Sequence, residues 1–170
     1  MKRLLALIVA VLVVSGLRAQ QKADFSNVTV KDLSGKEVSV AGLSKDGNPV
    51  MLVFWSTWCK SVCYKMLDEL NDHYKSWREK TGVKIYAIAI DDMRTADKVL
   101  PAVNGKDWDF EMLLDDKGEL KRAVKVSAPP YLCLLNGKGK VVSRHAYSDD
   151  VVDILHNELL FIKFNQQYNE

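Results

Sequence analysis

The sequence predicts an α/β fold with a mixed central sheet flanked by helices. Two stretches, residues 50–55 and 83–90, are apolar almost throughout, as expected for strands that are buried on both faces. Each is followed by residues with helical spacing, and a hairpin and a last helix complete the chain. Strand–helix alternation of this kind is typical of a sheet covered by helices on both faces.

The first elements are an N-terminal hairpin, the first buried strand and a long helix. Residues 27–40 alternate apolar and polar side chains on both sides of Ser34-Gly35, which predicts two antiparallel strands joined by a turn. After the strand at 50–55, apolar side chains at helical spacing predict a helix from about Cys59 to Lys80, which Gly82 ends.

The second half of the chain predicts shorter elements. A final helix begins near Asp149, with Ser148 or Asp149 as its N-cap, and has one apolar face. The elements before it are a short helix over 94–103 that is interrupted or begins anew around Pro101, an extended segment over 110–114, a short helix over 117–124, a strand over 131–135 and its antiparallel partner over 140–145.

The N-terminus has the pattern of a signal peptide. Lys2 and Arg3 precede an unbroken apolar run over 4–14, and Ala19 offers a small residue for cleavage. A transmembrane helix needs about 20 apolar residues, so we expect a signal peptide over 1–19 and a mature domain over 20–170. An uncleaved membrane anchor is the alternative. The expected location is outside the cytoplasm, in the periplasm.

Composition excludes two classes of protein. The net charge is +2 and there is no basic run, so the sequence does not indicate nucleic-acid binding. Three cysteines are too few for a disulfide framework. An exported cysteine pair is nevertheless in a compartment where disulfides persist.

Two of the three cysteines stand where a strand meets a helix. Cys59 opens the helix that follows residues 50–55, and Cys63 lies four residues later. The free N–H groups and the positive end of a helix stabilise a thiolate. A cysteine there is therefore a candidate nucleophile or metal ligand near neutral pH, and Lys60 adds a nearby positive charge.

Four segments resemble the thioredoxin-like superfamily, and within it the exported TlpA/ResA-like thiol-disulfide oxidoreductases. They are the hairpin DLSGKEVSV at 32–40, FWSTWC at 54–59 beside the family's F-W-A-T-W-C, CYKMLDEL at 63–70 beside C-x-x-x-M-x-E-L, and 126–140 beside V-x-G-x-P-x-x-F-L-I-D-x-x-G-K.

The resemblance implies a thioredoxin-like fold and disulfide exchange with protein thiols. It implies that Cys59 is the nucleophile and Cys63 the resolving thiol, while Trp58 with Pro129 and Pro130 contacts the substrate. In that family the proline that matches Pro130 is cis. The implied partners are proteins with thiols or disulfides and a redox partner protein; no cofactor is needed, and only an uncleaved leader would contact a membrane.

The chain departs from the family inside the redox motif. The family has W-C-x-x-C, but three residues separate Cys59 from Cys63 here. Cα atoms at i and i+4 of a helix are about 6.2 Å apart, and disulfides accept about 4.4–6.8 Å, so a bridge is allowed. Carboxylates found in relatives are replaced by Met66 and Val53. The Asp91-Asp92 pair is a substitute in principle, but strand-end carboxylates are expected to be solvated.

Other functions remain open on this motif. A C-x-x-x-C pair resembles the Sco copper metallochaperones, and thiolates suit Cu(I), but their third ligand, a histidine, falls near Ala128. Peroxiredoxins place proline and threonine where this chain has Leu52 and Ser56. A non-catalytic thioredoxin-fold interaction protein is the third alternative. Cys133 is expected to be a small buried apolar side chain.

Overall fold

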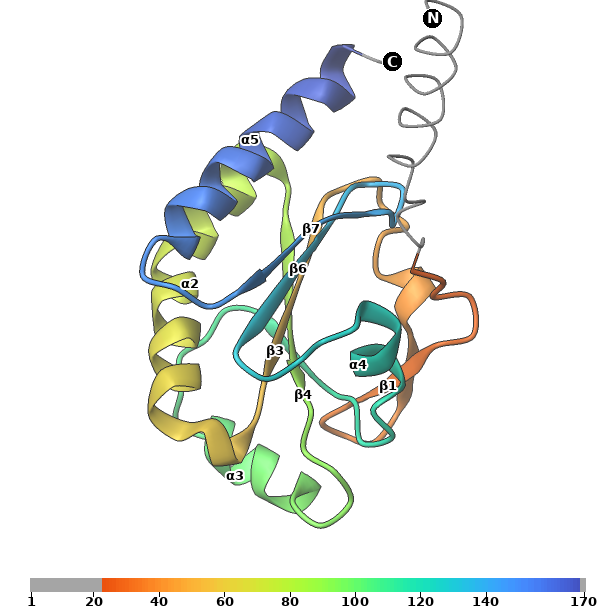
Figure 1. Ribbon diagram of the computed structural model, residues 1–170, viewed down its shortest axis with the longest axis vertical. Helices are drawn as coiled ribbons and strands as arrows, with labels where there is room; N and C mark the ends of the chain where they lie inside the picture. The colour runs from red at the N-terminus through yellow and green to blue at the C-terminus, as the bar shows by residue number, and fades with distance from the viewer. Residues whose placement is uncertain (1–22, 169–170) are drawn as a thin grey trace, which may run out of the picture.

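The computed structural model describes residues 23–168, which form one seven-stranded sheet with helices on both faces (Figure 1). The strands are β1 Thr29–Asp32, β2 Glu37–Ser39, β3 Val50–Trp55, β4 Lys84–Ala89, β5 Glu111–Leu114, β6 Tyr131–Leu135 and β7 Val141–Ala146. Their order is β2-β1-β5-β4-β3-β6-β7. The neighbours β3, β4 and β5 run parallel, and all other neighbouring pairs are antiparallel. The predicted mixed sheet with its N-terminal hairpin is confirmed.

Helices cover this sheet from both sides. They are the 3-10 turns η1 Val40–Gly42, η2 Thr57–Cys59 and η3 Ala96–Lys98, and the α-helices α2 Lys60–Thr81, α3 Val99–Val103, α4 Glu119–Val124 and α5 Val151–Tyr168. In Figure 1, α2 and α5 lie side by side on one face, whereas α4 lies on the other face near β1.

The central strand β3 is fully buried because it is paired on both edges and covered on both faces. Met51, Val53 and Trp55 join the core beneath α2 and α5. The alternate residues of the strand join the second core, which also holds Leu120 and Val124 of α4. The alternation follows from the period of two in a strand.

Two predicted helices begin or divide differently in the structure. The segment predicted over 94–103 divides into η3 and α3, and Pro101 lies in the first turn of α3, where a missing N–H is tolerated. The final helix begins at Val151 rather than at Asp149, after a turn in which the Val151 N–H donates to the Ser148 carbonyl.

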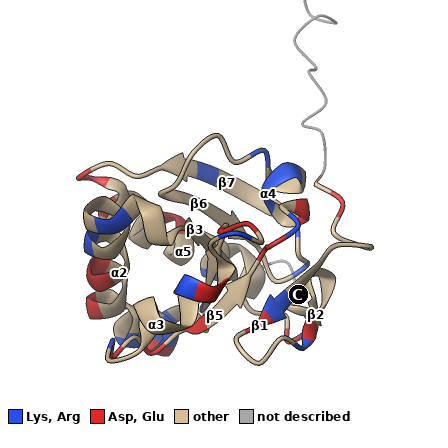
Figure 2. Cartoon of the chain, turned by 90° about the horizontal axis from the view of Figure 1, so that it is seen from below, with Lys and Arg blue, Asp and Glu red and all other residues tan. Residues whose placement is uncertain are grey.

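The leader predicted over residues 1–19 lies outside the described residues. Within residues 23–168, no helix combines the length and the apolar character that a membrane crossing requires. Viewed from below, acidic and basic residues are interspersed along α2 and around β1, β2 and β5 (Figure 2).

Candidate active site at the start of helix α2

The carboxyl ends of the parallel strands place three loops at one edge of the sheet. The loop after β3 leads through η2 into α2 and carries the cysteine pair, while Asp91 and Asp115 follow β4 and β5. The Ile90 N–H donates to the Trp55 carbonyl at 2.9 Å, which joins the first two of these loops at their origin.

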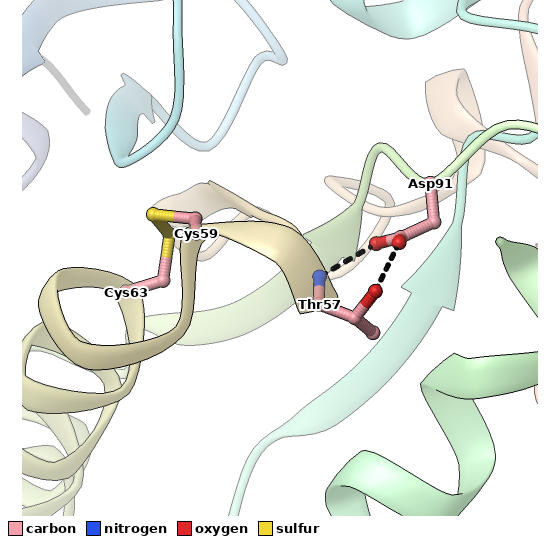
Figure 3. The surroundings of a disulfide bond; sticks show 4 residues. All are labelled: Thr57, Cys59, Cys63 and Asp91. Atoms are coloured by element: carbon pink, nitrogen blue, oxygen red, sulfur yellow. Dashed lines mark hydrogen bonds between the residues drawn. A yellow bond between two sulfur atoms is a disulfide. The ribbon is translucent and has the colours of Figure 1, made fainter.

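Cys59 and Cys63 form a disulfide. Their Cα atoms are 5.6 Å apart, which is shorter than the roughly 6.2 Å of regular helix. The difference arises because Cys59 belongs to the 3-10 turn η2 and only Cys63 lies within α2. The bridge that the sequence allowed is therefore present, and it closes the first turn of the helix (Figure 3).

The longer motif is accommodated at Lys60. This residue has φ of 28° and ψ of −102°, whereas Cys59 before it is in the right-handed helical region. Positive φ is unfavourable for a residue with a Cβ atom. The extra residue between the cysteines is thus taken up by one backbone position, and α2 continues regularly after it.

The two cysteines of the disulfide differ in exposure. Cys59 is partly exposed, whereas Cys63 is fully buried among the residues beneath α2. Trp58, beside Cys59, is 60% exposed, and Val62, between the two cysteines, is 47% exposed. An incoming group can therefore reach Cys59 beside an apolar surface, but not Cys63.

The proline turn lies at the same edge as the disulfide. The Pro129–Pro130 peptide bond is cis, as the family resemblance implied for Pro130. Tyr131, the next residue, opens β6 and pairs with Phe54 of β3. The turn therefore enters the sheet beside the point where β3 leads toward Cys59. Both prolines are partly exposed.

Asp91 corrects an expectation from the sequence. It was expected to be solvated at a strand end, but it is fully buried, and its carboxylate faces the start of the redox loop (Figure 3). The Thr57 N–H donates to Oδ2 at 2.9 Å, and the Thr57 hydroxyl donates to Oδ1 at 2.5 Å. Asp92 is exposed and binds Arg94, as expected of a surface residue. Sequence spacing gave no signal for the Asp91–Thr57 contact, because 34 residues separate the two.

Cys133 is the small buried side chain that was expected. It is fully buried in β6 opposite Leu52 of β3. Burial raises the pKa of the Cys133 thiol to about 12. It remains a thiol at neutral pH, so the cysteines of the disulfide are the redox-accessible pair.

Glu69, part of the motif in α2, has a structural contact. The Tyr147 hydroxyl donates to its carboxylate at 2.7 Å, and Lys65 lies 3.5 Å from it. Burial, and next the hydrogen bond to Glu69, raises the pKa of Tyr147. These contacts join the first half of α2 to the connection between β7 and α5.

Two of the histidine side chains, those of His145 and His156, make contacts away from the disulfide. His156 accepts a hydrogen bond from Trp77 at 2.9 Å, and His145 lies 3.1 Å from Glu158. Within residues 23–168, no group of three or more His, Cys, Asp or Glu side chains is arranged to hold a metal ion.

Comparison with known proteins finds ResA thiol-disulfide oxidoreductases among the relatives of this chain. The ResA thiol-disulfide oxidoreductase of Bacillus thuringiensis subsp. konkukian is 34% identical over 116 residues, and that of Bacillus subtilis is 31% identical over 120 residues. These alignments cover 68% and 71% of this chain. The chain spans 64% of the length of both relatives. The predicted resemblance to ResA-like proteins is confirmed.

Solved structures and a family model agree with the fold. A thioredoxin-like protein from Porphyromonas gingivalis, solved in solution, superposes with a TM-score of 0.72 at 33% identity, covering 83% of this chain and 92% of that one. The thioredoxin-like fold is therefore confirmed. The model of the AhpC/TSA family matches residues 21–146, so this chain belongs to the AhpC/TSA family.

Proposed function

We propose that this protein is a thiol-disulfide oxidoreductase that exchanges disulfides with protein thiols through Cys59 and Cys63. The observation that carries the proposal is the disulfide at the start of α2, with one partly exposed and one buried partner. The ResA relatives have this activity in their names.

The exchange proceeds in two balanced steps. In the reduced protein, the Cys59 thiolate attacks one sulfur of a substrate disulfide; a mixed disulfide forms and the other substrate sulfur leaves as a thiolate. The Cys63 thiolate then attacks the Cys59 sulfur, which restores the bridge and releases the second substrate thiolate. Two electrons pass to the substrate, and the reverse sequence oxidises it.

The residue roles follow from exposure. Cys59 is the nucleophile because a substrate sulfur can reach it, and buried Cys63 resolves the mixed disulfide intramolecularly. Trp58 and the turn at Pro129 and Pro130 form the apolar contact for the substrate chain. Prolines have no N–H, so this turn offers the substrate apolar rings and carbonyl groups only.

Export and partners belong to the same proposal. The leader over residues 1–19 directs the chain out of the cytoplasm, and the domain over 20–170 works in the periplasm. Because disulfides persist there, a second redox protein must return Cys59 and Cys63 to their starting oxidation state after each turnover. The substrates are proteins with accessible thiols or disulfides, and the reaction needs no cofactor.

The test is turnover of a protein disulfide. Reduced protein should reduce insulin disulfides, and both Cys59→Ser and Cys63→Ser should lose turnover at least a thousandfold, as expected when a nucleophile or its resolving partner is removed. Cys133→Ser is the matched control, because its sulfur is sealed in the core. If the Cys59–Cys63 bridge cannot be reduced and reformed reversibly, the proposal is wrong.

Three other outcomes would assign a different function. Stoichiometric Cu(I) binding that Cys59→Ser abolishes, without insulin turnover, would assign a metallochaperone. Consumption of hydrogen peroxide instead of disulfides would assign a peroxidase. A protein with neither activity that still binds partners would be a non-catalytic interaction module.

A further inference from the structure

We infer that Asp91 is a positioning residue for the redox pair: its buried carboxylate holds Thr57 and thereby fixes the turn that presents Cys59 to Cys63. This inference rests on the proposed function and adds a residue that does not touch the reacting sulfurs. In Figure 3 the carboxylate lies on the side of the loop away from the disulfide, and Thr57 stands between them.

The turn lacks a side-chain cap of its own. Ser56 occupies the N-cap position of η2 and has a suitable side chain, yet it makes no capping hydrogen bond. Its hydroxyl is buried without a hydrogen-bond partner. Cys59, at the N-cap of α2, makes no side-chain capping bond either. No side chain of the local sequence therefore caps the N–H groups at this helix start.

Asp91 supplies the missing cap from the loop after β4. Its carboxylate accepts both the N–H and the hydroxyl of Thr57, the first residue of the turn. Two bonds from one residue to one carboxylate fix both the position and the rotation of that residue. The Ser56 carbonyl then accepts the Cys59 N–H at 3.2 Å, which closes the turn beneath the nucleophile.

Burial of the Asp91 carboxylate has a cost in folding free energy. Asp91 is fully buried, and it has no ion pair with Lys, Arg or His within residues 23–168. A buried charge without a cation is unfavourable for folding. An apolar side chain would fill this position at a lower cost in folding free energy. The value of Asp91 therefore lies in the geometry that its carboxylate imposes on Thr57.

The consequence is a preorganised pair. If the turn keeps its shape after reduction, closing the disulfide orders little additional chain, and the two thiols have a high effective concentration. Without the carboxylate, the turn samples other conformations in the reduced protein. Disulfide formation must then reorder it, and the equilibrium moves toward the dithiol.

The experiment measures the equilibrium between the Cys59–Cys63 pair and glutathione, which reports that effective concentration. Asp91→Ala removes both hydrogen bonds to Thr57 and should lower the effective concentration at least tenfold, since about tenfold is the equivalent of losing one hydrogen bond to a charged group. Thr57→Val should lower it less, because the N–H bond remains, and Thr57→Ser should restore the wild-type value. Asp91→Asn, which keeps the shape but not the charge, should fall between Asp91→Ala and wild type.

The chain provides a matched control. Asp115 is also buried, follows the adjacent strand β5, and accepts N–H bonds from Leu120 and Lys121 at the start of α4. Asp115→Ala should lower the unfolding temperature while leaving the glutathione equilibrium within twofold of wild type. An equal loss of thermal stability in Asp91→Ala and Asp115→Ala, with no change in either equilibrium, would overturn the inference.

A second measurement separates this inference from the proposed function. In the reduced wild-type protein, the Thr57 and Cys59 amides should exchange slowly with deuterium. Asp91→Ala should accelerate both at least tenfold, the loss expected for one such bond, whereas Thr57→Val, which keeps the backbone N–H bond to Asp91, should accelerate them less. If wild type does not equilibrate with glutathione, the proposed function fails but the exchange rates still decide the role of Asp91. Unchanged exchange rates in both variants would refute that role.

Discussion

Helix α2 begins at the redox pair and ends at Gly82, and its two ends are held in different ways. At the C-terminal end, the Gly82 N–H donates to the Arg78 carbonyl at positive φ, and the Thr81 hydroxyl donates to the Trp77 carbonyl. At the N-terminal end no side chain of the local sequence caps the helix, and Lys60 has an unfavourable backbone conformation. The C-terminal end is thus capped by local residues, whereas the N-terminal end is held by Asp91 from the loop after β4 and by the disulfide.

Two tryptophans show the same contrast. Trp77 is 2% exposed, donates to His156 and stacks on His73, whereas Trp58 is 60% exposed beside Cys59. The same residue type thus stabilises the fold at one end and faces solvent at the other. Substitutions at both ends of α2 test this difference.

Trp77→Ala should lower the free energy of unfolding by about 3–5 kcal/mol, because a large buried side chain is removed from the core. Trp58→Ala should change it by less than about 0.5 kcal/mol, as for most exposed positions. Urea denaturation of the oxidised proteins measures both. Similar losses in the two variants would show that Trp58 is also part of the core packing.

Trp58→Ala should instead slow exchange with a protein disulfide about tenfold, which is the range of an aromatic contact at an interface. Exchange with a small aromatic disulfide reagent should change by less than threefold, since that reagent has no extended chain to bind. Stopped-flow rates with both substrates provide the test. An equal reduction with both would indicate an effect on Cys59 itself.

Gly82→Ala should destabilise the protein by about 1 kcal/mol, because φ is 75° and only glycine adopts it without strain. A Cβ atom here would also lie 2.5 Å from the Asn48 side-chain oxygen, so Asn48 must move. Thermal unfolding measures the loss. The redox equilibrium should not change, and a change would mean that the two ends of α2 are coupled.

Lys60→Gly should favour the disulfide about fivefold, since relief of positive φ is worth about 1 kcal/mol. The structure shows positive φ at Lys60 in the oxidised form, and the expected shift rests on this residue leaving positive φ when the bridge opens. Lys60→Ala keeps the Cβ atom and removes the charge, and it is the control for electrostatic effects. If both variants shift the glutathione equilibrium equally, charge rather than backbone conformation is responsible.

Cys133 should show no reaction at pH 8, where a thiol with a pKa of about 12 is about 0.01% ionised. Iodoacetamide should label Cys59 of the reduced native protein and reach Cys133 only after unfolding. The raised pKa also predicts that stability is retained below pH 9 and lost between about pH 9 and 12, because the unfolded thiol ionises first. Cys133→Ala should flatten that part of the pH profile, and an unchanged profile would contradict the shift.

The strands and the redox motif were predictable because their signals are local. The apolar run at residues 50–55 is long enough to require burial, and the strand predicted there matches β3 to the residue. Cys59 and Cys63 are close in sequence, so helix geometry alone showed that a bridge was possible.

Two features of the site were not predictable for physical reasons. The role of Asp91 depends on the parallel pairing of β3 and β4, which brings Thr57 beside a residue 34 positions later. The conformation of Lys60 had no signal, because lysine has no preference for positive φ. The sequence showed that an extra residue lay between the cysteines, but not which backbone position accommodates it.

The conformation of Lys60 has a consequence for engineering this domain. The β3 pairing ends at Trp55, before the redox loop begins, and α2 regains regular geometry directly after Lys60. The irregularity is thus confined to a segment that contributes neither to sheet register nor to the packed part of the helix. A chain without Lys60 would have two residues between the cysteines, and we expect its sheet and core to be unaffected. The number of residues between Cys59 and Cys63 can therefore be varied while Thr57 keeps its contact with Asp91, so motifs of different length can be compared on one scaffold.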